Sequence, residues 1–131
     1  NGGGRIMALF MMAELTALLR TLVPGIEIVG NDFAAKNPDD CAYARINGGP
    51  PPKEWSSVSY PSIQIVVRAK KASDAEAKAN AFFTTLHNKR EFAVGTTRVI
   101  RSEAEQSAPF YLGVDENSRT MYSVNFTFTA V

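Results

Sequence analysis

Side chains able to do catalytic or metal chemistry are few and scattered along the chain. His87 is the sole histidine among 131 residues, so no second imidazole can share a metal site or a dyad with it. At a helix end we expect His87 to be exposed or to interact with the helix dipole. Cys41 follows Asp40 and lacks the cationic neighbours that favour a thiolate, which predicts a small strand residue. A single cysteine also forms no internal disulfide, so the chain needs no oxidising compartment.

The paired carboxylates and the glycine runs also have structural explanations. Asp39-Asp40 and Asp115-Glu116 fall in turns, where aspartate bonds to its own backbone, and neither pair has the further oxygen ligands of a calcium loop. Gly48-Gly49 lacks the lysine and the strand-to-helix context of a phosphate-binding loop. We therefore predict no enzyme, no metal and no cofactor. An enzyme that uses Asp40 or His87 stays as a third alternative.

Composition indicates one globular domain without a polyanionic partner. Hydrophobic residues make up 45% of the chain, charged residues 21%, and the formal net charge is +1. There is no basic excess for binding nucleic acid through phosphates, and no apolar run approaches the ~18 residues of a membrane span. The apolar stretch 6–12 continues as an amphipathic helix, unlike a signal peptide, which favours synthesis in the cytoplasm. We expect residues 1–6 to be a cloning remnant and residues 7–131 to be a single domain.

The elements that must position these residues are clearest between Pro61 and His87. Residues 62–68 alternate, which predicts a strand with Ile63, Ile65 and Val67 on one face and Gln64, Val66 and Arg68 on the other. Ser73 and Glu76 have the spacing of a capping box, so a helix should begin near Asp74. Its apolar stripe is Ala75, Ala79, Phe82, Phe83 and Leu86. The helix should cover the isoleucine face and leave the face with Arg68 free.

Other segments complete the predicted fold. A second amphipathic helix is expected over residues 7–23, and strands over residues 26–29, 41–46, 96–103, 109–114 and 122–129. The segment 96–103 carries several charges, which suits an edge strand, an exposed hairpin or a projecting arm. We expect an α+β, sandwich-like fold: a mainly antiparallel sheet of about four or five strands with two helices packed on one face.

The segment from Gly48 to Tyr60 is the least regular part of the chain. Its three consecutive prolines exclude regular structure, and long irregular loops are often functional. Trp55 and Tyr60 are typical interface anchors, although Trp55 could equally cover one end of the core. Arg45 and Arg68 lie on the less apolar strand faces, which suits contact with another subunit or plain solvation.

Several strings in this order resemble the phage minor capsid protein family, which is related in fold to siphophage tail terminators. They are Asp40-Cys41, Gly48-Gly49-Pro50-Pro51, the strand from Tyr60 through Arg68 to Lys70, the helix end Leu86-His87, residues 109–119 and residues 122–126. The resemblance covers nearly the whole chain from about Met7. Asn88 stands where the family pattern has glycine, which still allows the helix to end.

The resemblance implies a structural, non-catalytic protein of the virion. Such a subunit forms a ring, expected to be hexameric, at the head–tail junction of a phage or prophage, with the major tail protein and a head-completion or connector protein as partners. A ring needs two unlike adhesive surfaces on each subunit. The candidate interface residues are Arg45, Pro51, Trp55, Tyr60, Arg68, Arg101 and Arg119. The alternative is a non-catalytic α+β module that binds a peptide or small ligand through the loop from Gly48 to Tyr60.

Overall fold

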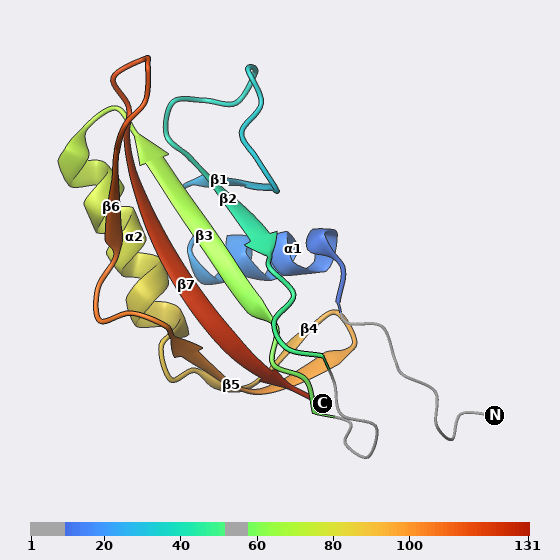
Figure 1. The fold of residues 1–131 in the computed structure, drawn as a ribbon. Helices are drawn as coiled ribbons and strands as arrows, with labels where there is room; N and C mark the ends of the chain where they lie inside the picture. The colour runs from blue at the N-terminus through green and yellow to red at the C-terminus, as the bar shows by residue number, and fades with distance from the viewer. Residues whose placement is uncertain (1–9, 52–57) are drawn as a thin grey trace.

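The computed structural model describes residues 10–51 and 58–131. This part of the chain contains seven strands and two helices, with strand covering 41% and helix 22% of it. In chain order they are α1 (Met12–Leu22), β1 (Glu27–Gly30), β2 (Cys41–Ile46), β3 (Ser62–Ala69), α2 (Ala72–Leu86), β4 (Arg90–Val94), β5 (Thr97–Ala104), β6 (Phe110–Val114) and β7 (Thr120–Ala130). The strands form one sheet in the order β1-β2-β3-β7-β5-β4, and β6 also pairs with β7 (Figure 1).

The predicted α+β sandwich with about four or five strands is wrong. The chain builds a mostly β structure, in which a seven-stranded sheet curls into a half-barrel. Strand β4 escaped prediction because most of its residues are exposed and Glu91 has a left-handed φ of 51°, so the strand lacks an apolar alternation. The segment 96–103 is neither an edge nor an arm, since β5 lies between β7 and β4.

The core fills the concave side of the curled sheet. β3 and β7 run antiparallel with Ile65 opposite Val124 and Ile63 opposite Phe126, and all four side chains are fully buried. Helix α2 lies against β3, β7 and β5, and helix α1 lies against β1, β2 and β4. Burial of each large apolar side chain contributes about 1.5–3 kcal/mol, so this cluster is the main source of stability.

Helix α2 confirms the predicted stripe but not the predicted cap. Ala75, Ala79, Phe82 and Leu86 are fully buried. The helix begins earlier than expected, at Ala72, and its N-cap is Lys71, which makes no side-chain capping bond. Asn88 follows the helix with a φ of 60°, the left-handed conformation that asparagine tolerates.

Helix α1 is shorter than the predicted helix. It begins at Met12, where the backbone N–H of Met11 donates to Glu14 Oε1 at 2.8 Å, and residues 7–9 of the predicted helix lie outside the described residues. Leu15 and Leu19 enter the core. Within the described ranges, neither helix is long and apolar enough to cross a membrane.

Candidate interaction surface

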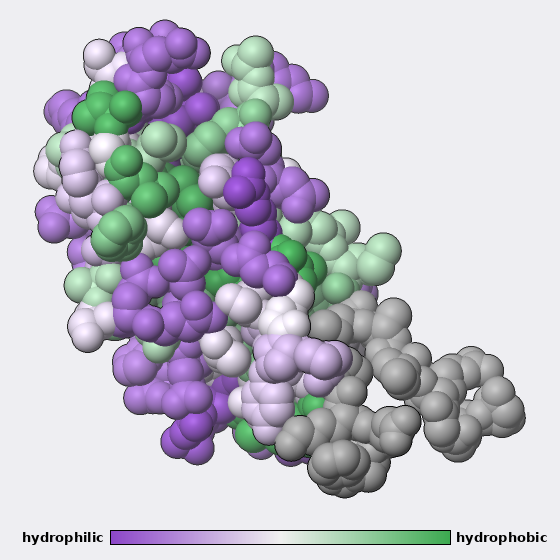
Figure 2. All heavy atoms as spheres, viewed as in Figure 1, coloured by the Kyte–Doolittle hydropathy of each residue, from purple (hydrophilic) through white to green (hydrophobic). Residues whose placement is uncertain are grey.

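Strand β6 is an exposed apolar strand at the margin of the sheet. Its four large side chains are far more exposed than the core: Phe110 is 62%, Tyr111 54%, Leu112 42% and Val114 54% accessible. Among the described residues β6 pairs with β7 alone, so its other edge has no strand partner. Figure 2 shows hydrophobic atoms gathered over this part of the molecule, at the upper left. An apolar strand with a free edge favours association with another chain.

The side chains of β6 project to both faces of the sheet. Tyr111 lies opposite Tyr122, and their rings meet edge to face at 5.5 Å. Phe110 lies opposite Ser123 and therefore points to the other face. A register shift near Gly113, whose φ of 108° is unfavourable for other residues, separates these pairs from the strand end. A partner strand would meet apolar groups above and below the free edge.

The side chain of Gln106 fills the gap between β5 and β6 and bonds to β7 there. Both strands pair with the same edge of β7: β5 pairs near the end of β7, and β6 pairs near the start of β7. In the gap, Gln106 Oε1 accepts hydrogen bonds from the backbone N–H and the Nδ2 of Asn125, at 3.0 and 2.9 Å. Gln106 Nε2 donates to the carbonyl of Ser123 at 3.1 Å. The amide of Gln106 thus takes the place of a backbone pair and connects the two strands along β7.

Glu105 fastens the same segment to β3 and β7. One of its carboxylate oxygens, Oε2, accepts hydrogen bonds from Ser62 Oγ at 2.8 Å and Thr127 Oγ1 at 2.7 Å. The backbone N–H of Glu105 donates to the carbonyl of Asn125 at 2.8 Å. The polar residues of segment 105–106 therefore fix the position from which β6 begins, a function that the sequence pattern did not suggest.

An ion-pair network supports the other end of β6. Arg119 Nε donates to Asp115 Oδ2 at 2.8 Å, and Arg119 Nη1 lies 3.3 Å from Asp39 Oδ1. Asp115 also accepts from the backbone N–H groups of Arg119 and Asn117, both at 2.9 Å. The backbone N–H of Arg119, followed by that of Asn117 and the guanidinium, lowers the pKa of Asp115 below its usual value. The network joins the turn after β6 to the loop before β2.

Arg68 lies inside the fold and holds that loop. It is 4% exposed, and its guanidinium donates to the carbonyls of Pro38 at 2.7 Å and Asp39 at 3.1 Å while stacking 4.0 Å above the ring of Phe33. The expectation that the strand face bearing Arg68 is free is wrong at this end, because the loop 31–40 covers it. A contact of Arg68 with a neighbouring subunit stays a prediction. Because Arg68 is buried, it would influence such an interface through the position of the loop 31–40.

The remaining predicted interface residues lie apart from one another. Arg45 is partly exposed, bonds to the carbonyl of Asn31 and stacks 4.7 Å above Tyr43. Arg101 pairs with Glu103 at 3.0 Å on β5.

The ends of the proline loop are described, but its middle is not. Pro51 and Tyr60 are exposed, and the backbone of Gly49 lies against the carbonyl of Tyr60 at the base of the loop. Trp55 lies outside the described residues, as does most of the proposed peptide-binding loop. Both the Trp55 contact and the alternative binding role of this loop stay predictions.

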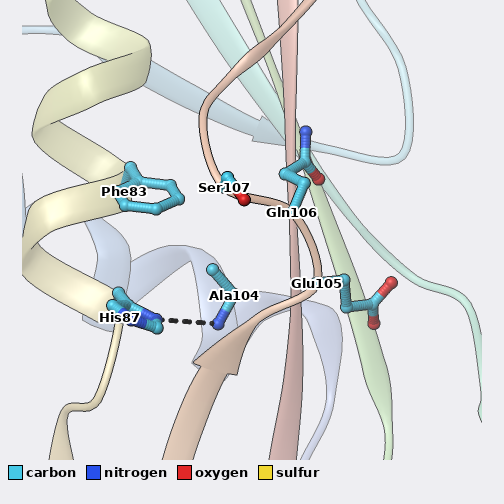
Figure 3. A pocket seen from close by; sticks show the side chains of 6 residues that line it. All are labelled: Phe83, His87, Ala104, Glu105, Gln106 and Ser107. Atoms are coloured by element: carbon cyan, nitrogen blue, oxygen red, sulfur yellow. Dashed lines mark hydrogen bonds between the residues drawn. The ribbon is translucent and has the colours of Figure 1, made fainter.

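The contacts that the described part of the chain gives to His87 are structural and include no catalytic constellation. Its Nδ1 accepts a hydrogen bond from the backbone N–H of Ala104 at 3.2 Å, and its ring stacks on Phe83 with centroids 5.4 Å apart. These residues border an open groove of about 500 Å³ (Figure 3), which Glu105, Gln106 and Ser107 also line. Figure 3 shows the Glu105 carboxylate turned away from the imidazole, so the two groups form no acid–base pair.

Cys41 and the carboxylate pairs offer no better chemistry. Burial raises the pKa of the Cys41 thiol, so it is protonated and a weak nucleophile at neutral pH. Asp39 and Asp115 are occupied by Arg119. In the ranges 10–51 and 58–131 no three histidine, cysteine or acidic side chains gather as a metal site. The surface that stands out is therefore adhesive: an apolar strand edge held at both ends by polar networks.

Comparison with known proteins identifies the family to which this surface belongs. A family model described as "Bacteriophage tail terminator protein" matches residues 29–131, which include every strand from β2 to β7 and helix α2. No curated protein matches the chain. The match confirms the resemblance to tail terminators seen in the sequence, while the description as a minor capsid protein stays untested. The chain belongs to the bacteriophage tail terminator protein family.

Proposed function

We propose that the protein is a ring-forming tail terminator subunit at the head–tail junction of a phage or prophage. Family membership makes it a structural component of the virion that contacts other phage proteins. In the proposed role a ring of subunits, hexameric in our expectation, caps the last ring of the tail tube, stops its growth and presents a surface to the head connector. The observation that carries the proposal is the apolar edge strand β6 on a chain of this family.

The distribution of exposed apolar side chains supports ring formation. Among the described residues, four of the seven large exposed hydrophobics lie on β6, namely Phe110, Tyr111, Leu112 and Val114, and the other three, Met11, Tyr60 and Val131, lie on other segments. Strand β6 and the C-terminus lie toward opposite ends of the molecule in Figure 1. A closed ring requires two different patches on each subunit, one docking on the other in the next copy.

An assembly assay tests the role directly. The major tail protein of the same phage is polymerised in the presence of this chain, and tubes are examined by electron microscopy with and without heads carrying the connector. We expect tubes of limited length with a ring at one end, and joining of heads to capped tubes only. Tubes that grow past the added protein and remain uncapped would contradict the proposal.

A charged substitution on β6 should weaken capping. Leu112→Lys places an ammonium group in the apolar patch without touching the core, so capping should require at least about tenfold more protein. Ala77→Lys adds the same charge on an exposed position of α2 and is the matched control. Equal capping by both variants would show that β6 is not an assembly surface.

A further inference from the structure

We infer that the free edge of β6 pairs with the outer edge of β4 from a second copy of this chain, in antiparallel orientation. Neighbouring subunits would then share one continuous sheet. The inference rests on the proposed ring, because pairing of two different edges is a contact that repeats from copy to copy and can close into a ring.

Among the described strands, three edges border the sheet, and one of them is blocked. Beside β6, the margins are β1 and β4. At β1, Arg20 Nη2 donates to the carbonyl of Ile28 at 2.8 Å, so an acceptor that a new strand would need is already used. At β4, the described residues provide a partner on the β5 side alone. Within residues 10–51 and 58–131, the two edges without a strand partner or a blocking side chain are therefore β6 and β4, which are five residues long each.

Charge favours a β6–β4 contact over two identical edges meeting. β6 itself is uncharged and leads to Glu116, while β4 begins at Arg90 and follows Lys89. Arg90 and Glu116 are exposed, and the described residues give neither of them an ion pair. Antiparallel pairing places the start of the incoming β4 beside the end of β6, and hence Arg90 of one copy beside Glu116 of the other. Pairing of two β4 strands, or of two β6 strands, would bring together no such opposite charges.

The path of the sheet leaves room for the incoming strand. β5 and β6 follow one another along the same edge of β7, and the outer side of β5 carries the chain's own β4. A strand added to β6 in antiparallel orientation would continue the line of that β4. Its end would reach the groove bordered by Phe83, His87 and Ala104 (Figure 3). The groove therefore marks where the chain's own β4 begins and where the second copy's strand would end.

The shape of β4 limits how strong this contact is. Glu91 has a left-handed backbone and pairs with Arg98 at 3.0 Å, so the regular outer edge is Phe92–Val94. Backbone pairing over three residues buries far less surface than the roughly 1,200 Å² of a stable interface. The apolar side chains of β6 must supply most of the buried area, and we expect weak association of isolated subunits.

Amide NMR of the full chain over a concentration series can detect such weak pairing. We expect the amide signals of residues 110–114 and 92–94 to shift or broaden together as the protein concentration is raised to about 1 mM. Shifts at β6 alone would indicate a symmetric β6 dimer or a different partner edge and would overturn the inference. Spectra that do not change with concentration would overturn it as well.

Charge exchange tests the orientation of the contact. Glu116→Arg and Arg90→Glu should each weaken association roughly three- to tenfold, and an equimolar mixture of the two variants should restore it, since every interface of an alternating ring then has one pair of opposite charges. Glu76→Arg, on an exposed position of α2, should change nothing. A mixture no better than the single variants would overturn the proposed orientation.

The capping assay separates this inference from the role on which it depends. Capping by the wild-type chain, together with charge variants that associate normally, would reject the β6–β4 contact and leave the terminator role standing. Paired amide shifts and restored association in a chain that caps no tubes would reject the role and leave the contact.

Discussion

Arg68 shows how one buried charge can organise a surface that it does not reach. Its guanidinium binds two carbonyls and the Phe33 ring, and thereby holds the loop 31–40 over the end of β3. Asp39 in that loop then meets Arg119 beside β6. The prediction of Arg68 as a contact residue came from strand alternation, which identifies the face of a residue but not the loop that covers it.

Loss of the Arg68 guanidinium should therefore destabilise the monomer. Arg68→Met keeps much of the side-chain volume but leaves the carbonyls of Pro38 and Asp39 without their donor, so we expect the free energy of unfolding to fall by about 1–3 kcal/mol. Arg45→Met, at a partly exposed residue, should cost less than about 1 kcal/mol. Urea denaturation measures both, and equal effects would contradict a special role for Arg68.

Asp115 should make stability sensitive to acid. The pKa of Asp115 is lowered in the folded state from its usual value of 3.8. Its carboxylate therefore stabilises the fold at pH values above 3.8, and this contribution disappears as the pH falls through the folded pKa. Asp115→Asn keeps an oxygen that can accept from Asn117 and Arg119 but removes the charge. The urea midpoint of the variant should be lower than that of the wild type at pH 7, and the difference should shrink toward pH 3. A difference independent of pH would contradict this assignment.

At the scale of elements, the interrupted strand formed by β5 and β6 is the feature least accessible to sequence reasoning. β7 was predictable because Tyr122, Val124, Phe126 and Phe128 alternate, and the α2 stripe was predictable from its helical spacing. The bond between Gln106 and Asn125 depends on residues 19 positions apart, with no local periodicity to indicate it. Long-range polar pairs of this kind follow from the register of the sheet, which the sequence alone does not specify.

Removal of the Gln106 side chain should loosen β6 selectively. Gln106→Ala leaves the backbone N–H of Asn125 and the carbonyl of Ser123 without their partners, so hydrogen exchange in residues 110–114 should accelerate while exchange in β3 stays slow. Gln106→Glu retains the acceptor and loses the donor, and we expect an intermediate effect. Acceleration spread evenly over the sheet would indicate general destabilisation instead.

At the scale of the whole molecule, the sequence predicted the family and most of the strands but not the shape of the sheet. β4 was not predicted, because its exposed residues and left-handed Glu91 do not resemble a strand pattern. β1 was predicted as a strand over residues 26–29, but its place at a margin of the sheet was not, nor was its parallel pairing with β2, the one parallel pair among the described strands. Two margins of the sheet therefore became visible in the structure, together with the contact that we propose between β6 and β4.

The buried position of Cys41 allows opening of the fold to be measured as the rate at which its thiol is labelled. This single thiol is fully buried in β2, directly opposite Arg68 on β3, so a thiol-reactive dye can reach it after β2 and the loop 31–40 have opened. The labelling rate should therefore rise steeply in Arg68→Met and fall when subunits assemble. This cysteine would thus report, without any engineered label, how often β2 and the loop 31–40 open.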